Sequence, residues 1–365
     1  ITWSNATTSG DMDVNNLWIA AYSTINNANL IIEGVTATEG VVSDSLKNNY
    51  IAEAYFVRAL CYYSLVTIYA RPYNENGGAS KAIPLRLNAE ISSTNNNLAC
   101  STVAEIYQQI LSDLDKAETQ LPLNYSTSLL NTTRAHRNTA IALKTRVYLS
   151  MGNFSKVVEE AQKIVTQTTA PFSATIGVKH KLQDIATIFS TDYTTTESVF
   201  SMPMTATDSY ANQSALGYVY NANTEYYLNS EGILGDTLWK STDLRRQFLR
   251  NASGKYYLKK YAKATPYVDF IPVIRYAEVL LNYAEAAAKI NDLTLAGELL
   301  NAVRKRSDAT FIFADSQVIT KEALISTILN ERRIELLGEG FRSNDLLRTL
   351  QTIPAKGSNS MHVNA

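Results

Sequence analysis

The chain is poor in the residue types that build metal and redox sites. Its 365 residues include two cysteines, Cys61 and Cys100, and three scattered histidines, His136, His180 and His362. No HExxH motif and no paired cysteine ligands occur. Cys61 falls in an apolar helical pattern and is expected to be a small buried hydrophobic residue. The sequence therefore predicts no metal and no cofactor, and its cysteines identify no redox compartment.

An excess of one charge and long apolar runs are also missing. The 33 Lys and Arg residues balance 34 Asp and Glu residues, so nothing favours nucleic acid or an anionic membrane surface. No run reaches the roughly 18 apolar residues of a membrane-spanning helix, and residues 1–10 lack the parts of a signal peptide. With 45% hydrophobic and 18% charged residues, the chain is expected to be globular.

Catalytic motifs are absent as well, since the sequence has no GxSxG, GxGxxG or P-loop. The best candidates for catalysis are Glu331 and Glu335, which lie one turn apart on an expected helix. A glycosidase needs carboxylates that face each other across the sugar, which one helix face does not provide. A structural ion network with Arg275, Arg342 or Arg348 explains them better. The sequence predicts no catalytic residue and no enzyme.

Apolar residues recur at helical spacing toward both ends of the chain. Thr102 and Glu105 form a capping-box pattern, and Pro122 ends the helix that follows them. Gly34 is expected to cap the first helix. The other expected helices span residues 15–34, 46–69, 139–150 and 155–166.

Two helix–turn–helix units, 141–166 and 280–306, have the spacing of tetratricopeptide repeats. In each, a small or aromatic residue on the first helix precedes a short polar turn, and a small residue follows early in the second helix. Ordinary helical hairpins with similar packing are the alternative. The pattern predicts a mainly α fold built on helix pairs.

Between residues 171 and 272 the helical period fades. Ten of the 22 tyrosines lie between residues 190 and 270, where an even spread would put about five. Residues 251–254 followed by 255–261 predict a turn and a short strand. Because loops on a rigid scaffold carry most binding residues, the ligand is expected in this insertion.

Charges within the insertion are segregated. Residues 182–239 contain seven acidic and no basic residues, whereas residues 240–263 contain eight basic residues and one acid, Asp243. One interpretation is that the two stretches pack together and neutralise each other. The other is an acidic ligand surface, which would disfavour sulfated or uronic ligands.

Several short segments, read in order, carry a family resemblance. The strongest is the run 274–286, followed by Glu331-Arg332-Arg333 and Gly338-Glu339-Gly340 in segment 328–348. Upstream segments with matching spacing are 16–29, 53–63, 83–85 and 107–122. Together they are spread over residues 16–348 of the 365. In this order the chain resembles the SusD/RagB family of outer-membrane nutrient receptors.

This resemblance implies a single SusD-like domain, residues 1–365, whose tetratricopeptide (TPR) pairs form a right-handed superhelical scaffold at 15–170 and 273–350. It implies a surface-facing lipoprotein of the outer membrane in Bacteroidota. Such a protein captures oligosaccharides or polysaccharides, or in some members peptides, and delivers them to a TonB-dependent (SusC-like) transporter. The family's lipidated N-terminal cysteine and its C-terminal tail are expected to lie outside this sequence. Membrane contact would then depend on that lipid anchor alone.

Sugar binding requires aromatic rings for the apolar face of a pyranose and polar groups for its hydroxyls. The candidates outside the helical core patterns are Trp3, Tyr73, Asn74, Tyr210, Asn212, Tyr218, Tyr220 and Trp239. Ordinary packing is the alternative for each, and Trp239 fits a core position equally well. Two rival functions stay open, a tetratricopeptide scaffold that binds a peptide and an α-helical glycoside hydrolase.

Overall fold

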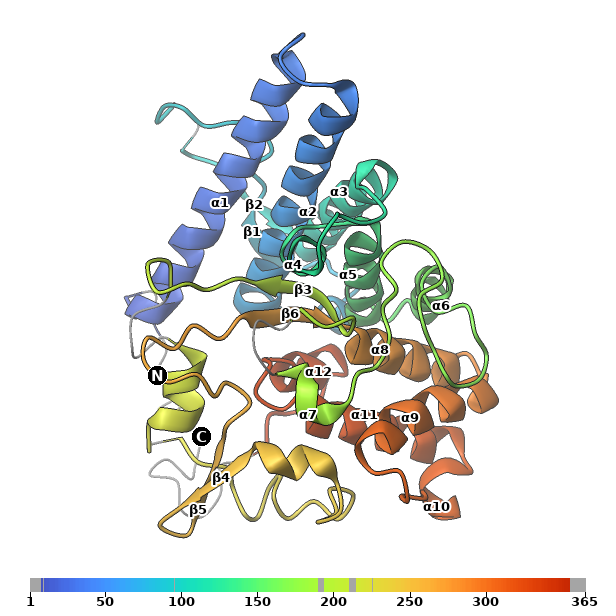
Figure 1. The fold of residues 1–365 in the computed structure, drawn as a ribbon. Helices are drawn as coiled ribbons and strands as arrows, with labels where there is room; N and C mark the ends of the chain where they lie inside the picture. The colour runs from blue at the N-terminus through green and yellow to red at the C-terminus, as the bar shows by residue number, and fades with distance from the viewer. Residues whose placement is uncertain are drawn as a thin grey trace. The chain divides into compact units, whose positions relative to one another are not determined.

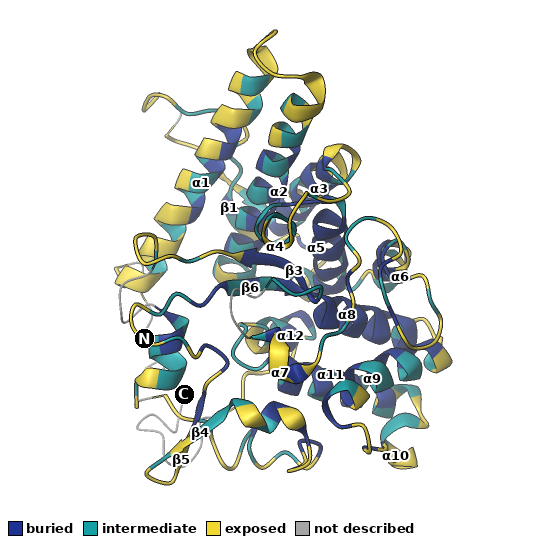
Figure 2. Ribbon diagram, viewed as in Figure 1, coloured by how far each residue is buried: buried dark blue, intermediate teal, exposed yellow. Residues whose placement is uncertain are grey.

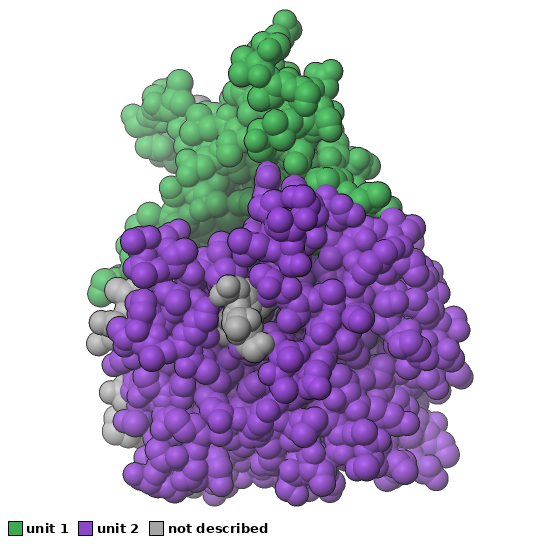
Figure 3. Space-filling model, viewed as in Figure 1, with its two compact units in different colours: residues 1–123, 135–153, 343–365 green, residues 124–134, 154–342 purple. Residues whose placement is uncertain are grey.

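The computed structural model describes residues 8, 10–94, 96–189, 194–209, 215–224 and 226–354. Within these residues the chain is mainly helical, as predicted, with twelve α-helices and six short strands (Figure 1). The chain divides into two compact units, which Figure 3 colours separately. Unit 1 comprises 1–123, 135–153 and 343–365, and unit 2 comprises 124–134 and 154–342. The expectation of one domain stays a prediction.

Unit 1 contains most of the N-terminal helices. Its elements are α1 (Met12–Ala37), α2 (Asp44–Tyr69), β1 (Lys81–Pro84), β2 (Cys100–Thr102), α3 (Val103–Gln120), α5 (Arg137–Ser150) and most of α12 (Arg342–Arg348). The capping box of α3 is confirmed, because Glu105 N donates to Thr102 Oγ1 at 3.2 Å and Thr102 N donates to Glu105 Oε2 at 2.7 Å. The predicted cap at Gly34 is wrong, since α1 continues to Ala37 and Thr38 is its C-cap.

Helix α2 is the core helix of unit 1. By length and composition it could cross a membrane, but most of its apolar residues are buried in the unit, and Phe56 and Leu65 are fully so. Arg58 of α2 forms a buried two-pronged ion pair with Asp113 of α3, at 2.8 and 2.7 Å. A buried charge paired in this way is typical of a protein interior that holds two helices in fixed register.

Unit 2 is built around α8 (Tyr276–Lys289), whose residues from Tyr276 to Ala288 are all buried (Figure 2). Helices α6 (Phe154–Gln162), α9 (Leu293–Ser307) and α11 (Lys321–Glu335) pack against it. Its small residues, such as Ala284 and Ala287, allow this close approach on several sides. The remaining helices of the unit are α4 (Ser128–Thr133), α7 (Ile185–Ile188) and α10 (Asp315–Val318).

The predicted unit 280–306 is confirmed as the antiparallel neighbours α8 and α9. Asn291 takes the left-handed conformation in their turn, at φ 72°, and Asp292 caps α9 by accepting from Leu295 N at 3.1 Å. The predicted unit 141–166 forms α5 and α6, which belong to different compact units.

The insertion contains three strands of unit 2 and the start of a fourth, β6 (Ile271–Arg275). Strands β3 (Ser198–Met202) and β6 pair antiparallel, and β6 leads directly into α8. The predicted turn and strand are confirmed as a hairpin of β4 (Leu249–Ala252) and β5 (Lys255–Leu258). Its two turn residues, Ser253 and Gly254, have positive φ angles of 51° and 77°, as a tight hairpin turn requires.

Candidate ligand-binding site

A cluster of buried charges joins the insertion to the helices of unit 2. We call it the buried ion cluster. Among the described residues it comprises five carboxylates, Glu197, Asp243, Glu331, Glu335 and Glu339, and five cations, Arg245, Lys260, Arg275, Arg304 and Arg306. Each of these side chains is at most 7% exposed. Since the two signs balance, the cluster is a neutral structural unit.

Arg275, at the junction of β6 and α8, shows how the cluster is tied together. Its guanidinium donates to Glu197 at 2.6 Å, to Glu335 at 2.9 Å and to Glu339 at 2.8 Å. The structural network predicted for Glu331 and Glu335 is thus confirmed, with Arg275 as a partner. Arg348 pairs with Asp345 instead, at 2.8 Å.

The protonation of these groups follows from their neighbours. Burial alone would raise the pKa of Glu335, but the guanidinium groups of Arg306, Arg275 and Arg245 hold that pKa well below its ordinary value. Burial would likewise lower the pKa of Arg275, and Glu339 and its neighbouring carboxylates raise it well above its usual range. Glu335 is therefore a fixed acceptor, which is the opposite of what a general acid needs.

The counter-charges of the insertion come from β6, from helices α9 and α11 and from the turn after α11. Glu197 pairs with Arg275 and Arg306, and Arg333 lies 3.6 Å from Asp236. Lys260 of the basic stretch pairs with Glu339 at 2.7 Å. For these groups the interpretation that the two stretches neutralise each other is wrong. The burial of Glu197 also weakens the case for an acidic ligand surface.

Three exposed tyrosines surround the β4–β5 hairpin. Tyr226 is 44% exposed, Tyr227 is 38% exposed and Tyr256 is 41% exposed, and we call them the hairpin tyrosines. Leu228 N donates to Tyr256 O at 2.8 Å, and this bond places the segment that contains Tyr226 and Tyr227 beside β5. The Lys255 ammonium lies 4.3 Å from the centre of the Tyr227 ring. Sequence reasoning did not single these rings out, because their exposure depends on the hairpin pairing.

Two predicted residues, Tyr218 and Tyr220, lie close by in sequence on the π-helical turn Tyr218–Ala222. Both are half-buried. Tyr218 meets the Tyr267 ring edge-on at 5.9 Å, and Tyr220 stacks on the buried Tyr261 ring at 6.2 Å. Burial raises the pKa of the Tyr220 hydroxyl. Each ring thus has at least one aromatic neighbour and is partly exposed.

Trp239 lies in the core of unit 2. It is 2% exposed, and the Arg246 guanidinium lies 4.6 Å from the centre of its ring. The ring therefore presents no open face to a ligand in this structure. This is the core position that the sequence left open as the alternative.

Tyr73 and Asn74 belong to unit 1. The Tyr73 ring packs edge-on against Tyr107 at 5.3 Å, beside a crevice of about 20 Å³, which has room for about one water molecule. Asn74 Nδ2 donates to Ser150 O at 3.2 Å and to Arg348 O at 2.9 Å. The amide of Asn74 thus ties together three segments of unit 1.

Three further predicted ligand contacts, Trp3, Tyr210 and Asn212, lie outside the described residues. Within the described part of the chain, no group of three or more His, Cys, Asp or Glu side chains is arranged to hold a metal ion.

The comparisons with known proteins agree on one family. Residues 2–149 match the family model described as "Starch-binding associating with outer membrane", a SusD-like family. The chain is 27% identical to SusD-like protein P2 of Formosa agariphila, covering 92% of this chain and 71% of that protein. It is similar to the crystal structure of a SusD superfamily protein from Bacteroides fragilis, with a TM-score of 0.86 and 32% identity. That match covers 96% of this chain and 78% of the other.

A more distant structure shares the fold. It is a SusD-like carbohydrate binding protein from Bacteroides vulgatus, with a TM-score of 0.76 and 21% identity over 93% of this chain and 71% of the other. Family model, relative and solved structures thus point to the same group as the helical architecture, and the chain belongs to the SusD superfamily.

Proposed function

We propose that the chain binds an oligosaccharide without cleaving it and delivers it to a TonB-dependent outer-membrane transporter. SusD family proteins are non-enzymatic binding proteins, and the matching family model is described as starch-binding and associated with the outer membrane. The observation that carries the proposal in this chain is the group of hairpin tyrosines, of which Tyr256 is exposed on β5 and Tyr226 and Tyr227 are exposed in another segment of unit 2.

Exposed tyrosines suit a sugar ligand for a physical reason. A tyrosine ring offers an apolar face for the C–H side of a pyranose, and its hydroxyl hydrogen-bonds at the edge. Two side-chain torsions fix the ring, so ordering it on binding costs little entropy. Tyr226 and Tyr256 are the most exposed of the three, while the Lys255 ammonium covers part of Tyr227.

The residues chosen from the sequence remain part of the proposal. Tyr218 and Tyr220 are half-buried and are proposed to extend the surface. Tyr210 and Asn212, which precede them in the chain, are proposed contacts on sequence grounds alone. Tyr73, Asn74, Trp3 and Trp239 are also kept as candidates, although the burial of Trp239 counts against it.

Isothermal titration of alanine variants against neutral oligosaccharides tests the site. Tyr226→Ala and Tyr256→Ala are each expected to weaken binding about 5- to 10-fold, because each removes a stacking contact of about 1 kcal/mol. Phenylalanine at the same positions should keep most of the affinity. Tyr50→Ala is the matched control, since Tyr50 is 38% exposed on a helix of unit 1.

The outcomes separate the alternatives. Equal affinity of wild type and of all tyrosine variants, Tyr210, Tyr218 and Tyr220 included, would remove this surface as the site. Steady release of reducing ends from a bound glycan by the pure protein would contradict binding without turnover. Delivery is tested by co-purification from outer membranes, where a TonB-dependent transporter should accompany the chain and its absence would count against that step.

A further inference from the structure

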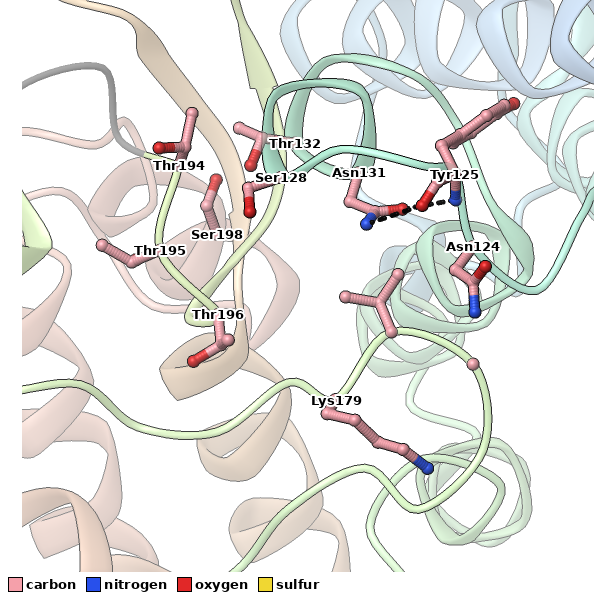
Figure 4. A pocket seen from close by; sticks show the side chains of 12 residues that line it. Asn124, Tyr125, Ser128, Asn131, Thr132, Lys179, Thr194, Thr195, Thr196 and Ser198 are labelled. Carbon is pink, nitrogen blue, oxygen red and sulfur yellow. Dashed lines mark hydrogen bonds between the residues drawn. The ribbon is translucent and has the colours of Figure 1, made fainter.

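A second site lies in unit 2, in a polar pocket of about 420 Å³ (Figure 4). Its walls come from three segments that are far apart in sequence, namely residues 124–132, 177–179 and 194–198. The volume falls in the range of about 300–1,000 Å³ that is usual for small-molecule sites. No motif in the sequence links these segments, so only the fold brings them together.

The chemistry of the walls is uniform. Seven of the twelve lining residues carry a hydroxyl group and two carry a side-chain amide. The lining contains no Asp or Glu, and its only charged side chain is that of Lys179, which is exposed. Hydroxyls and amides both donate and accept hydrogen bonds, so such a wall complements a ligand that does the same.

Some of these polar groups hold the pocket in shape. Asn131 Oδ1 accepts from Tyr125 N at 2.6 Å, and its Nδ2 donates to Tyr125 O at 3.2 Å. The Ser198 and Ser201 hydroxyls are 2.7 Å apart. The Arg134 guanidinium lies 4.8 Å from the centre of the Tyr125 ring and covers one of its faces. The walls are therefore fixed by internal bonds before any ligand binds.

Other polar groups in the lining have no hydrogen bond within the described structure. They are the side chains of Asn124, Ser128, Thr132, Thr194 and Thr195. Thr132 is 2% exposed, and its hydroxyl turns toward the same space as those of Ser128 and Ser198 (Figure 4). The Thr195 hydroxyl is buried and unpartnered. Buried polar groups are normally satisfied, so the unpartnered Thr195 hydroxyl, on the same cavity as the Thr132 hydroxyl, indicates a place where a ligand can supply a hydrogen-bond partner.

We propose that this pocket binds one uncharged sugar unit, through hydrogen bonds from Thr132 and Thr195 to its hydroxyl groups. A neutral polyol matches the unpaired hydroxyls and amides. A carboxylated or sulfated sugar would find a single counter-charge in the lining, the exposed Lys179 ammonium. The inference rests on the proposed function for the class of ligand. It adds a second point of recognition, which reads hydroxyl positions where the hairpin tyrosines read apolar sugar faces.

The test uses the full chain and a panel of neutral gluco-, manno-, galacto- and xylo-oligosaccharides, with affinities from isothermal titration. Thr132→Val and Thr195→Val keep the side-chain shape and remove only the hydroxyl. Each is expected to weaken binding of the preferred oligosaccharide about 3- to 10-fold, because one hydrogen bond is lost. Thermal unfolding should stay at the wild-type temperature or above it. Lys305→Gln, which changes an exposed lysine on α9 outside the pocket lining, is the matched control and should leave the affinity unchanged. Lys179→Gln removes the one charge in the lining and so reports whether the ligand is anionic.

Each outcome decides something. Unchanged affinity in both valine variants, with loss in Tyr226→Ala, would overturn the pocket and leave the proposed function standing. Loss of binding in Lys179→Gln alone would overturn the neutral ligand in favour of an anionic one. A wild-type chain that binds no member of the panel would contradict the proposed function and the pocket together. Measurable binding by the wild-type chain, together with weaker binding by both valine variants, would support the pocket.

Discussion

Acid is expected to destabilise unit 2 through one buried histidine, His180. The ring is fully buried and stacks on Tyr276, with ring centres 6.3 Å apart. Its Nδ1 donates to the Thr196 carbonyl at 3.0 Å, because a carbonyl oxygen can only accept. Burial lowers the pKa of His180 from 6.5 to about 4, and the bond to Thr196 opposes that shift without cancelling it.

The size of the effect follows from the two pKa values. The unfolded chain binds a proton at this histidine near pH 6.5, and the folded chain binds it only near pH 4. The folded pKa is depressed, so the stabilisation is fully present above pH 6.5 and is lost as the pH falls toward 4. The loss is about 2 kcal/mol at pH 5 and about 3 kcal/mol at pH 4.

The assay compares the free energy of unfolding of wild type and His180→Asn in urea at pH 7.5, 6, 5 and 4. Asparagine can donate to the Thr196 carbonyl but does not titrate. The variant should be less stable at pH 7.5, because it packs less well against Tyr276. The difference in free energy of unfolding between the two proteins should narrow by about 2 kcal/mol at pH 5, because only the wild type loses stability through His180. Other titrating groups affect both proteins equally and cancel. A gap that stays constant from pH 7.5 to 5 would refute the argument.

Three further changes test the described contacts. Glu335→Gln should lower the free energy of unfolding by about 3–5 kcal/mol, because it leaves buried cations uncompensated. The control Glu322→Gln changes an exposed residue of the same helix and should alter that free energy little. Urea unfolding measures both variants. Gly338→Ala should destabilise more than Gly340→Ala, by about 1–3 kcal/mol, because both have positive φ but only at Gly338 does the added Cβ collide with the Leu258 side chain. Equal losses in thermal unfolding would contradict this. Burial raises the pKa of the Cys61 thiol to about 12. At pH 8 a thiol reagent should therefore label the exposed Cys100 alone in the native chain and both cysteines in the denatured chain.

Local patterns allowed most of the helices to be predicted. The capping box at Thr102 and the α8–α9 pair depend on residues close in sequence, and both formed as expected. The end of α1 was predicted wrongly. Gly34 caps a helix only if its backbone becomes left-handed, and here the backbone of Gly34 stays helical. Tertiary contacts decide between these conformations, and they are not visible in a local window.

The candidate sites were harder to predict for the same reason. Arg275 was among the partners that the sequence offered for Glu335, because a carboxylate inside a helical core needs a cation beside it. The polar pocket joins residues near 130, 178 and 195, and each of these segments is an ordinary polar loop by itself. The exposure of Tyr256 depends on which face of the hairpin is covered, and its neighbour Tyr257 is 3% exposed. Composition could therefore indicate the insertion but not the residues.

The buried ion cluster explains how exposed tyrosines can be held ready for a ligand. Lys260 follows β5 by two residues and reaches Glu339 at 2.7 Å and the Glu335 carbonyl at 2.9 Å. Arg245 precedes β4 and reaches Glu331 at 2.7 Å. Both ends of the hairpin are thus fixed to the helical frame.

A cluster of this kind contributes little net stability, since well-packed apolar residues can often replace buried ion pairs without loss. Its effect is instead geometric, because each cation matches particular acceptors and so fixes where a loop docks. A hairpin fixed in this way loses less entropy when it binds. Lys260→Met should therefore weaken oligosaccharide binding several-fold, as a more unfavourable binding entropy in isothermal titration, although no proposed contact is removed. An unchanged affinity in a folded Lys260→Met chain would mean that the cluster supports the fold alone and contributes nothing to the site.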